Sequence, residues 1–326
     1  MTDNIASGGA ATAAQTARSS RRSAPSKQVG ALSRQRSKLY WPFIAPALVV
    51  YLALFFGPAL AGFWISFQSW RGSGDQMQFV GTRNYVRLWN DTAFMTAFGN
   101  SMKILVICGV VIFVLAFLIS AVLREMRFRK GLQALLFLPY IISPIAIGVG
   151  LGLLLDPNGL FNTGLRGIGL SSLAKPWLSP DRLFATILIG IVWVTTGFYV
   201  MLLMAGADRI PGYFYEDSQL AGANKFQQWW YVTLPLSWDV IAISAVLWVI
   251  NSLKIFEFVY AFTGTTDAPP EQARTVPIYQ FVMTMGGRNP AYQMGYGSAM
   301  GVVMVALVVV LVVLVRRVMR REAVTY

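Results

Sequence analysis

Six long apolar segments constrain this 326-residue chain more than any other feature of its sequence. They cover roughly residues 41–67, 100–123, 131–155, 182–206, 237–261 and 295–316. Each is close to or above the ~20 residues that a helix needs to cross ~30 Å of hydrocarbon. Charged residues make up only 13% of the chain, against about 25% in a typical soluble domain. We therefore predict an all-α, polytopic membrane helix bundle with six transmembrane helices.

Missing residue types exclude several chemistries. The chain has no histidine, so it offers no histidine general base, histidine-containing triad or imidazole metal ligand. The single cysteine, Cys108, lies in an apolar run, which excludes an intrachain disulfide and a cysteine-rich zinc site. The sequence has no G-x-x-x-x-G-K-[ST] loop with which to bind ATP. We expect no catalytic residue, no metal and no cofactor in this chain.

The N-terminal segment differs from the rest. Residues 1–38 are rich in Ser, Ala, Gly and basic residues and have almost no large apolar side chains. Such a segment buries too little apolar surface to offset the entropy of ordering, so we predict a disordered basic cytoplasmic tail at 1–38, followed by a transmembrane domain at 39–326. Ala59-Leu60-Ala61 has the form of a signal-peptide cleavage site. The long basic region and the five later apolar segments favour an uncleaved helix instead.

The distribution of Lys and Arg predicts the orientation in the membrane. The tail, the 124–130 loop, the 207–236 loop and the C-terminal end carry 17 of the 27 basic residues, and the other connections carry eight over much longer stretches. Basic residues are enriched in cytoplasmic loops, so we predict a multi-pass protein of the cytoplasmic membrane with both termini in the cytoplasm. This topology accounts for the net charge of +13 without a nucleic-acid partner.

Two apolar segments contain glycines four residues apart. These are Gly148 and Gly152, within Gly148-Val149-Gly150-Leu151-Gly152, and Gly297 and Gly301. Such a pair places two glycines on one helix face, where another helix can approach closely. Glycine-rich dinucleotide-binding loops are the alternative, but they follow a strand, and none is predicted here. We therefore expect two close helix–helix contacts.

The 208–236 loop, between the fourth and fifth apolar segments, is the most informative stretch of the chain. Pro211 suits the first turn of a short helix, and Glu216 and Asp217 fall early enough to interact with its dipole. Gly222 would break or bend that helix, and Pro235 would reopen the chain into the next span. We predict two short helices at the membrane surface, with interfacial aromatic residues at Phe226, Trp229, Trp230 and Tyr231.

This loop resembles that of a known family. Ile210-Pro211, Glu216, Gly222-Ala223 and Thr233-Leu234-Pro235 are similar to the E-A-A…G…L-P loop of permease subunits in binding-protein-dependent ABC importers, and most of all to the carbohydrate importers typified by the maltose permease subunit. The similarity extends over most of the chain after the tail, through Phe79-Val80-Gly81, Asn84-Tyr85, Phe137-Leu138-Pro139, Phe256-Glu257 and Thr263-Gly264. It implies the type I ABC importer permease fold.

The sequence departs from the family pattern at three places. The paired alanines after the glutamate are Asp217 and Ser218, and the acidic residue before the glycine is Ala221. Both changes fall where they would alter the fit to an ATPase partner. The family's T-G-G-x-P motif is replaced by Thr263-Gly264-Thr265-Thr266-Asp267, which affects an outer loop and not the class.

The resemblance implies a role in coupling. The short helix would insert into a groove on a separate ATPase subunit, and ATP would tilt the bundle between inward-open and outward-open states. Glu216 would position the loop through hydrogen bonds, and Gly222 would permit the bend. The alternative is an interfacial helix that only caps the bundle. The residues predicted to couple to the ATPase are Glu216, Asp217, Ala221, Gly222, Ala223, Leu234 and Pro235.

Polar residues inside two spans suggest a substrate path, because such residues usually face the bundle interior or a wet cavity. Asn251, Lys254 and Glu257 follow one another at intervals of three, which would give one slightly drifting stripe on a helix. Asn251 and Lys254 also fall where the maltose permease subunit has asparagines that contact sugar. A structural Lys254–Glu257 ion pair is the alternative. Adding hydroxyl and aromatic groups from span four, we predict a path of Thr196, Tyr199, Asn251, Lys254 and Glu257.

The resemblance therefore implies a transmembrane permease subunit of an ATP-driven importer for a mono- or oligosaccharide. Its implied partners are a second permease subunit in a heterodimer, two copies of a cytoplasmic ATPase subunit, an extracytoplasmic solute-binding protein, the sugar and membrane lipid. Because ATP hydrolysis belongs to the partner, we expect the chain itself not to be an enzyme. One alternative is a permease for glycerol phosphate or another polar solute, although Lys254 supplies only one cation for a phosphate. Another is a secondary transporter, although no convincing internal repeat is present.

Overall fold

The computed structural model of the chain describes residues 41–262, 269–286 and 291–320. The predicted tail at 1–38 lies outside the described residues, as does the whole Thr263–Asp267 segment. The described part is mostly helical, with one short hairpin in which β1 (Gln68–Ser69) pairs antiparallel with β2 (Gln78–Phe79). The all-α prediction is confirmed.

Four helices in the described part are long and apolar enough to cross a membrane without a break. The first, Trp41–Ile65, includes the wider turn η1 (Leu52–Phe56) and α2 (Gly57–Ile65). The second, Thr92–Arg124, joins α4 (Thr92–Lys103), η2 (Ile104–Cys108) and α5 (Gly109–Arg124). The other two are α9 (Pro180–Ala207) and α16 (Met294–Val318). All four overlap predicted spans.

The third and fifth predicted spans are each part of a bent pair of helices. Helix α6 (Arg129–Ile141) meets α7 (Pro144–Leu154) at 92°, and the helical segment Lys225–Leu236 meets α13 (Trp238–Leu253) at 73°. Ser143, with ψ at 129°, is extended, because a residue that precedes proline avoids the helical region. If each pair counts as one span, the described chain has the six predicted crossings.

The fifth span ends earlier than predicted. Helix α13 stops at Leu253, Lys254 caps it with ψ near 0°, and a separate helix, α14 (Glu257–Phe262), follows. The predicted continuous helix over 237–261 is therefore wrong, and so is the single stripe of Asn251, Lys254 and Glu257. The pattern of apolar residues continues through the break, so the sequence gives no periodicity signal for it.

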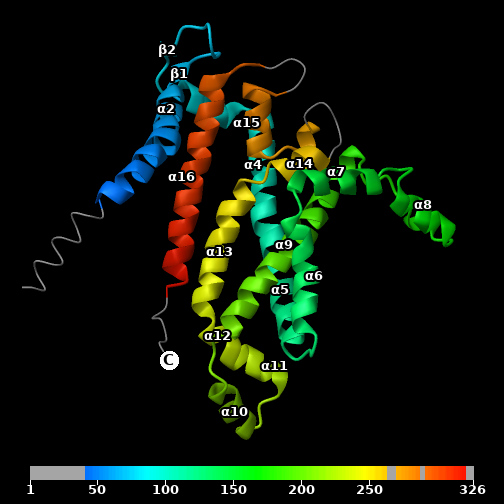
Figure 1. Cartoon of the computed structure of the whole chain (residues 1–326). Coiled ribbons are helices and arrows are strands. Elements are labelled where there is room, and N and C mark those ends of the chain that lie inside the picture. The colour runs from blue at the N-terminus through cyan, green and yellow to red at the C-terminus, as the bar shows by residue number, and fades with distance from the viewer. Residues whose placement is uncertain (1–40, 263–268, 287–290, 321–326) are drawn as a thin grey trace, which may run out of the picture. The chain divides into compact units, whose positions relative to one another are not determined.

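Short elements occupy the end of the bundle opposite to α10 (Tyr213–Leu220), as Figure 1 shows for β1, β2 and α15. They also include α3 (Arg83–Asn90) and η5 (Glu271–Ala273), and α15 spans Val276–Thr284. Helix α8 (Leu160–Gly167), which η3 (Ser171–Leu173) follows in the chain, extends to one side of the bundle beyond α7 (Figure 1). Two buried apolar clusters hold the chain together from Ala61 onward. The first joins α5, α9 and α14, the second joins α4, α15 and α16, and α13 contributes to both.

Both predicted glycine pairs pack against another helix. A Cβ atom on Gly148 would lie 2.8 Å from the Phe258 carbonyl oxygen, and one on Gly152 would lie 2.6 Å from the Phe262 carbonyl oxygen. Only glycine therefore lets α7 approach α14 this closely. In the second pair, a Cβ on Gly297 would collide with the Thr284 side chain of α15, and one on Gly301 would lie 3.1 Å from Gln280 Nε2. The prediction of two close helix–helix contacts is confirmed.

Candidate functional site

The 208–236 loop folds into two short helices, as predicted. Helix α10 (Tyr213–Leu220) begins after Gly212, so Pro211 precedes the helix and the prediction that it lies in the first turn is wrong. The second helix, α11 (Lys225–Gln228), continues through the wider turn η4 (Trp229–Thr233) into α12 (Leu234–Leu236). Pro235 lies at the start of α12, where proline is tolerated, and the chain bends at Ser237 instead.

Gly222 ends α10 by a specific backbone geometry. Its φ is +83°, in the left-handed region that glycine tolerates without a Cβ penalty. The Gly222 amide donates to the Gln219 carbonyl at 2.9 Å, and the Ala223 amide donates to the Ser218 carbonyl at 3.0 Å. This pair of bonds is a Schellman motif. The predicted break at Gly222 is confirmed.

Asn224 starts the second helix. Its side chain accepts from the Gln227 amide at 2.9 Å, and the Gln227 side chain accepts from the Asn224 amide at 2.8 Å. This reciprocal pair is a capping box, which the prediction missed although Asn224 and Gln227 stand at the required spacing. Together, the end of α10 and the start of α11 fix a tight corner between the two helices.

The outer face of α10 is exposed. Tyr213, Glu216, Asp217 and Leu220 repeat at helical spacing on this face, and Leu220 exposes 88% of its surface. A Cβ atom on Gly222 would meet nothing within 4 Å. The face therefore presents an apolar tip and two carboxylates to whatever covers it.

The seven predicted coupling residues fall into two groups. Glu216, Asp217, Ala221, Gly222 and Pro235 are exposed, whereas Ala223 and Leu234 are partly buried. Leu234 packs against the first apolar cluster. Leu234 therefore attaches the loop to the bundle, and the residues around the α10 tip are those open to a partner.

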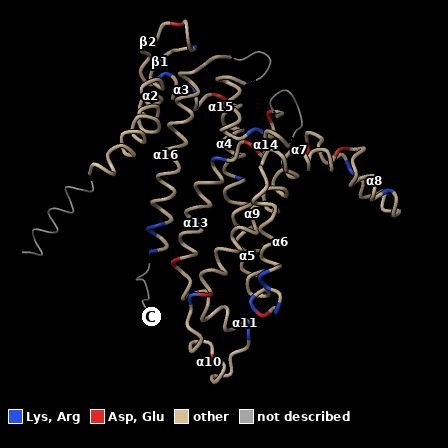
Figure 2. Tube along the Cα trace, in the orientation of Figure 1, with Lys and Arg blue, Asp and Glu red and all other residues tan. Residues whose placement is uncertain are grey.

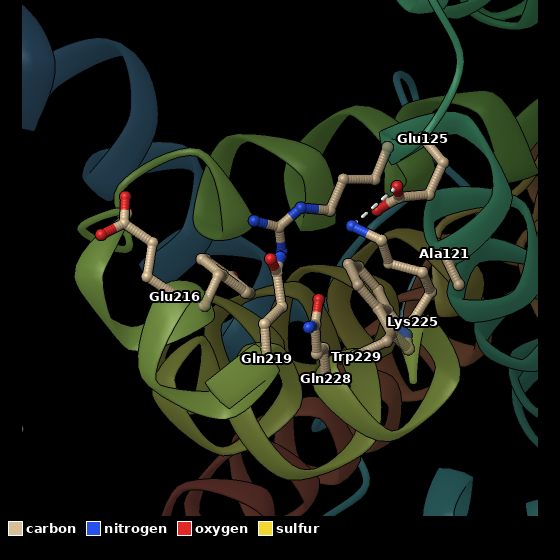
Figure 3. A pocket seen from close by; sticks show the side chains of 10 residues that line it. Ala121, Glu125, Glu216, Gln219, Lys225, Gln228 and Trp229 are labelled. Carbon is tan, nitrogen blue, oxygen red and sulfur yellow. Dashed lines mark ion pairs between the residues drawn. The ribbon is translucent and has the colours of Figure 1, made fainter. Parts of the chain in front are cut away.

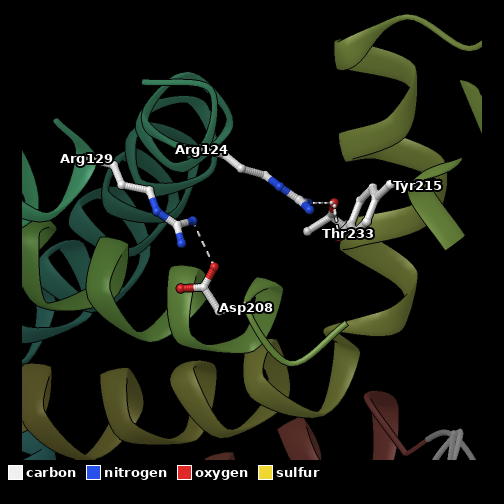
Figure 4. A network of polar contacts seen from close by, with 5 residues as sticks. All are labelled: Arg124, Arg129, Asp208, Tyr215 and Thr233. Carbon is white, nitrogen blue, oxygen red and sulfur yellow. Dashed lines mark hydrogen bonds and ion pairs between the residues drawn. The ribbon is translucent and has the colours of Figure 1, made fainter. Parts of the chain in front are cut away.

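The inner face of α10 is attached through three residues that we call the Arg124 cluster: Arg124, Tyr215 and Thr233. The guanidinium carbon of Arg124 lies 3.6 Å from the centre of the Tyr215 ring, and Arg124 Nη1 donates to Thr233 Oγ1 at 2.9 Å (Figure 4). The Tyr215 hydroxyl lies 3.0 Å from the same oxygen. The sequence analysis used Arg124 only as a basic residue that indicates membrane orientation. Nothing in its local sequence predicts its contacts with Tyr215 and Thr233.

A polar cavity of about 300 Å³ lies beside the Arg124 cluster. Figure 3 shows the Lys225 ammonium directed toward Glu125, with which it forms a 3.2 Å ion pair, while the Glu216 carboxylate points away from the other labelled side chains. A second ion pair, 2.9 Å long, joins Arg129 to Asp208. The side chains of both pairs are between one third and two thirds exposed, so water screens them.

Basic residues gather at this end of the bundle. Figure 2 shows them between α5 and α6, near α11 and at the C-terminal end of α16. In the described part of the chain, the 124–130 loop, the 207–236 loop and the end of α16, which the sequence assigned to one side of a membrane by their charge, therefore lie at the same end of the bundle.

The predicted substrate-path residues do not form one surface. Asn251, Lys254 and Glu257 are exposed at the break between α13 and α14. Tyr199 is only 1% exposed; its ring packs against Phe113 and Trp248, and its hydroxyl lies close enough to Asn251 to interact.

Thr196 belongs to a different surface. Its hydroxyl donates to the Val192 carbonyl of its own helix at 2.6 Å. The residue lines an apolar groove of about 830 Å³ formed by residues of η2, α5, α6 and α9. The structure therefore places Asn251 near Tyr199 but does not bring Thr196 together with the α13–α14 break.

A second polar cluster lies at the end of the bundle opposite to α10, and we call Asp91, Tyr279 and Tyr296 the Asp91 cluster. The Tyr279 and Tyr296 hydroxyls donate to Asp91 Oδ2 at 2.7 and 2.5 Å, and the Ala93 and Phe94 amides donate to Oδ1 at 3.0 and 3.1 Å. Burial raises the pKa of the Asp91 carboxyl, but these hydrogen bonds outweigh burial and hold the pKa below its usual value.

With this geometry established, comparison with known proteins identifies the family. Residues 112–324, more than half of the chain, match the family model described as the binding-protein-dependent transport system inner membrane component. The chain belongs to this family of permeases. The resemblance inferred from the loop is confirmed, and the protein is a multi-pass membrane permease subunit and not itself a catalytic enzyme.

Individual relatives agree with the family assignment. The permease is 28% identical to the lactose transport system permease protein LacF of Rhizobium radiobacter over 82% of this chain and 89% of the relative. It is 29% identical to the trehalose/maltose transport system permease protein MalF of Thermococcus litoralis over 85% of this chain and 92% of the relative.

Solved structures show the same fold. One chain of a bacterial ABC transporter involved in the import of the acidic polysaccharide alginate matches with a TM-score of 0.74 at 20% sequence identity. The match covers 89% of the permease and 98% of that chain. The prediction of an ABC importer permease fold is confirmed.

Proposed function

We propose that the permease carries a mono- or oligosaccharide into the cell across the cytoplasmic membrane, driven by ATP that a separate subunit hydrolyses. Support comes from the names of its relatives, which include transport systems for lactose, trehalose or maltose, and diacetylchitobiose. These relatives match over more than four fifths of this chain.

The exposed face of α10 is the observation that carries the proposal. A surface helix normally buries its apolar positions, yet Leu220 is 88% exposed at the tip of α10, beside Glu216 and Asp217. A partner that covers this tip would gain hydrophobic stabilisation roughly in proportion to the apolar area buried. We assign that role to a cytoplasmic ATPase, which would contact Glu216, Asp217, Ala221 and Gly222, while Ala223, Leu234 and Pro235 join the loop to the bundle.

The orientation follows from the same assignment. The basic end of the bundle carries α10 and the loop between α5 and α6 (Figure 2). Basic loops remain in the cytoplasm, so we assign α10 to the side where ATP is available. From their Lys and Arg content in the sequence, we assign both termini to the same side.

The full transporter would contain four kinds of subunit. We propose a second permease subunit, two copies of the ATPase and an extracytoplasmic solute-binding protein. A solved alginate ABC transporter that matches this chain with a TM-score of 0.72 was crystallised in complex with an alginate pentasaccharide-bound periplasmic protein. That neighbour supports a binding protein as the partner on the outer side.

The sugar would pass the break between α13 and α14. Asn251, Lys254 and Glu257 are exposed there, and a discontinuous helix is a common way to present polar groups to a substrate inside a membrane. Tyr199, which is buried next to Asn251, would support this surface from behind. Thr196 lines the apolar groove, so we do not include it in this path.

Purification of the complex tests the proposal. The permease is tagged in its native host and recovered from solubilised membranes, and we expect an ATPase and a solute-binding protein to accompany it. The binding protein is then screened against lactose, maltose, trehalose, diacetylchitobiose and glycerol 3-phosphate. Tight binding of a sugar supports the proposal, whereas selective binding of glycerol 3-phosphate supports the polar-solute alternative.

Two variants test the coupling assignment directly. Glu216→Ala removes a carboxylate from the exposed face of α10, and Glu125→Ala removes an exposed carboxylate at the same end that is not on α10. We expect Glu216→Ala to insert normally and lose ATP-driven uptake, and Glu125→Ala to retain it. Proton- or sodium-driven uptake by the permease alone would overturn the proposal in favour of a secondary transporter.

A further inference from the structure

Helix α10 buries a single residue, Tyr215, along its whole described length. Tyr215 is 8% exposed, and its ring and hydroxyl enter the Arg124 cluster (Figure 4). Side-chain packing can therefore transmit a force on α10 to the bundle through this residue. The backbone connections on either side are short turns, at Asp208–Gly212 and at Ala221–Asn224.

The Arg124 cluster joins three elements that are distant in the sequence. Arg124 is the last residue of α5, Tyr215 lies in α10, and Thr233 lies in η4, which leads through α12 into α13. The planar guanidinium of arginine uses its face and its edge at once: the face lies against the Tyr215 ring, and the edge donates to Thr233.

The hydrogen-bond geometry of the cluster is internally consistent. Thr233 is 1% exposed, so its hydroxyl needs partners within the protein. Its oxygen accepts from Arg124, and it forms a hydrogen bond of 3.0 Å with the Tyr215 hydroxyl. Its own hydrogen can reach the Gln228 carbonyl at 3.5 Å. These three contacts give the buried Thr233 hydroxyl hydrogen-bond partners both as an acceptor and as a donor.

The other polar links at this end are weaker candidates for transmitting force. Lys225–Glu125 joins α11 to the end of α5, but its side chains are 60% and 46% exposed. Arg129–Asp208 joins α6 to the end of α9, with side chains 34% and 50% exposed. Exposed ion pairs of this kind contribute little net free energy.

We propose that Arg124 is a positioning residue for energy coupling, which makes α10 move as one body with α5 and with the helix that leads into α13. The inference rests on the proposed function, because it requires an ATPase that pulls on α10. With the cluster intact, closure of the ATPase tilts α5 together with α10. Without Arg124, the same closure moves α10 alone, because Tyr215 loses its cation and Thr233 loses its donor.

Distances between two spin labels on this chain test the proposal in the tagged, assembled complex. One label replaces Tyr213 on α10 and the other replaces Val114 on α5, both as cysteines at positions about half exposed. The native Cys108 is fully buried and does not compete for labelling. Distances are measured with and without ATP and vanadate, after recovery of the ATPase with the labelled complex has been verified.

We expect the 213–114 distance to be unaffected by ATP and vanadate when the cluster is intact. In Arg124→Gln, the same addition should shift the mean distance by more than the width of the wild-type distribution. Thr233→Val, which removes only the hydroxyl, should give a smaller shift of the same kind, and it decides the question if Arg124→Gln does not assemble. A purely structural role would reduce recovery of the complex without producing an ATP-dependent shift.

Arg129→Gln is the matched control, because it removes an arginine and its ion pair at the same end of the bundle without touching the Arg124 cluster. It should behave as the wild type does. The inference is overturned if ATP leaves the distance unchanged in Arg124→Gln and Thr233→Val, or if Arg129→Gln shifts it equally. Absence of any ATPase from the wild-type complex would instead refute the proposed function.

Discussion

The two ends of the bundle are held by polar clusters of opposite charge. The Asp91 cluster ties the start of α4 to α15 and α16, and the Arg124 cluster ties the end of α5 to α10 and η4. Further bonds reinforce the Asp91 end, because Asn100 Nδ2 donates to two carbonyls of the 272–274 segment and Ser101 accepts from the Val276 amide. In contrast, α10 buries only Tyr215.

This difference assigns stability of the fold to the Asp91 end of the bundle and transmission of movement to the α10 end. One end is attached at many points, so it can keep its shape while the transporter changes state. At the other end, Tyr215 is the one buried side chain of the exposed helix α10. A partner that binds α10 can therefore move it. Variants at the Asp91 end should therefore change stability, and variants around α10 should change transport.

The largest effect is expected at Gly222, where Gly222→Val should abolish ATP-driven uptake. A left-handed conformation costs a non-glycine residue roughly 1–2 kcal/mol, which is enough to unravel the end of an exposed helix. The amount of permease in the membrane should not change, because a Cβ atom on Gly222 would meet no other part of the protein within 4 Å. Uptake into membrane vesicles and immunoblotting measure both quantities. Gly150→Ala, which adds a methyl group into open space, should leave both unchanged.

Gly152→Leu should cause the largest loss of stability. Its side chain would enter the space occupied by the Phe262 carbonyl, 2.6 Å from the position of a Cβ atom. Overpacking against backbone costs about 3 kcal/mol, and α14 would separate from α7. The Tm of the purified permease in detergent should fall clearly. An unchanged Tm would show that this contact does not support the fold, and would weaken the contrast between the two ends.

Asp91→Asn should destabilise the permease by about 1–3 kcal/mol, because it weakens four hydrogen bonds to a carboxylate. The carboxyl pKa is lowered in the folded state from an ordinary value of 3.8. Its stabilising contribution is therefore complete above that ordinary value and is lost as the pH falls through the lowered folded value. Between about pH 5 and about pH 3, the Tm of the wild type should decrease more than that of Asp91→Asn. Parallel decreases would contradict this role of Asp91.

The smallest effect is expected for Lys225→Ala. Its ion pair with Glu125 is exposed, so the free energy of unfolding should change by about 0–1 kcal/mol. Uptake should remain near the wild-type level. A large loss of uptake would mean that the exposed pair, and not only the Arg124 cluster, holds the loop to α5.

Local sequence determined the helices of this protein, two close helix–helix contacts and the corner in the 208–236 loop. Runs of apolar residues predicted the helices, since each must satisfy its backbone hydrogen bonds internally within the hydrocarbon. Glycines four residues apart predicted the close contacts of α7 and α16. Gly222 predicted a corner between two short helices, because few other residues adopt its backbone conformation. The order of Glu216, Gly222 and Pro235 identified the family before any comparison.

Tertiary structure decided the rest, because the deciding contacts join residues far apart in the chain. The pattern of apolar residues does not indicate that the fifth span is interrupted after Leu253. Because of this break, Asn251, Lys254 and Glu257 do not form the stripe predicted on one helix. The sequence analysis assigned Tyr199 to a substrate path, but packing against distant residues buries it in the core. Arg124 meets Thr233 across 109 positions of sequence, a separation at which no local pattern records which charged side chain faces which hydroxyl.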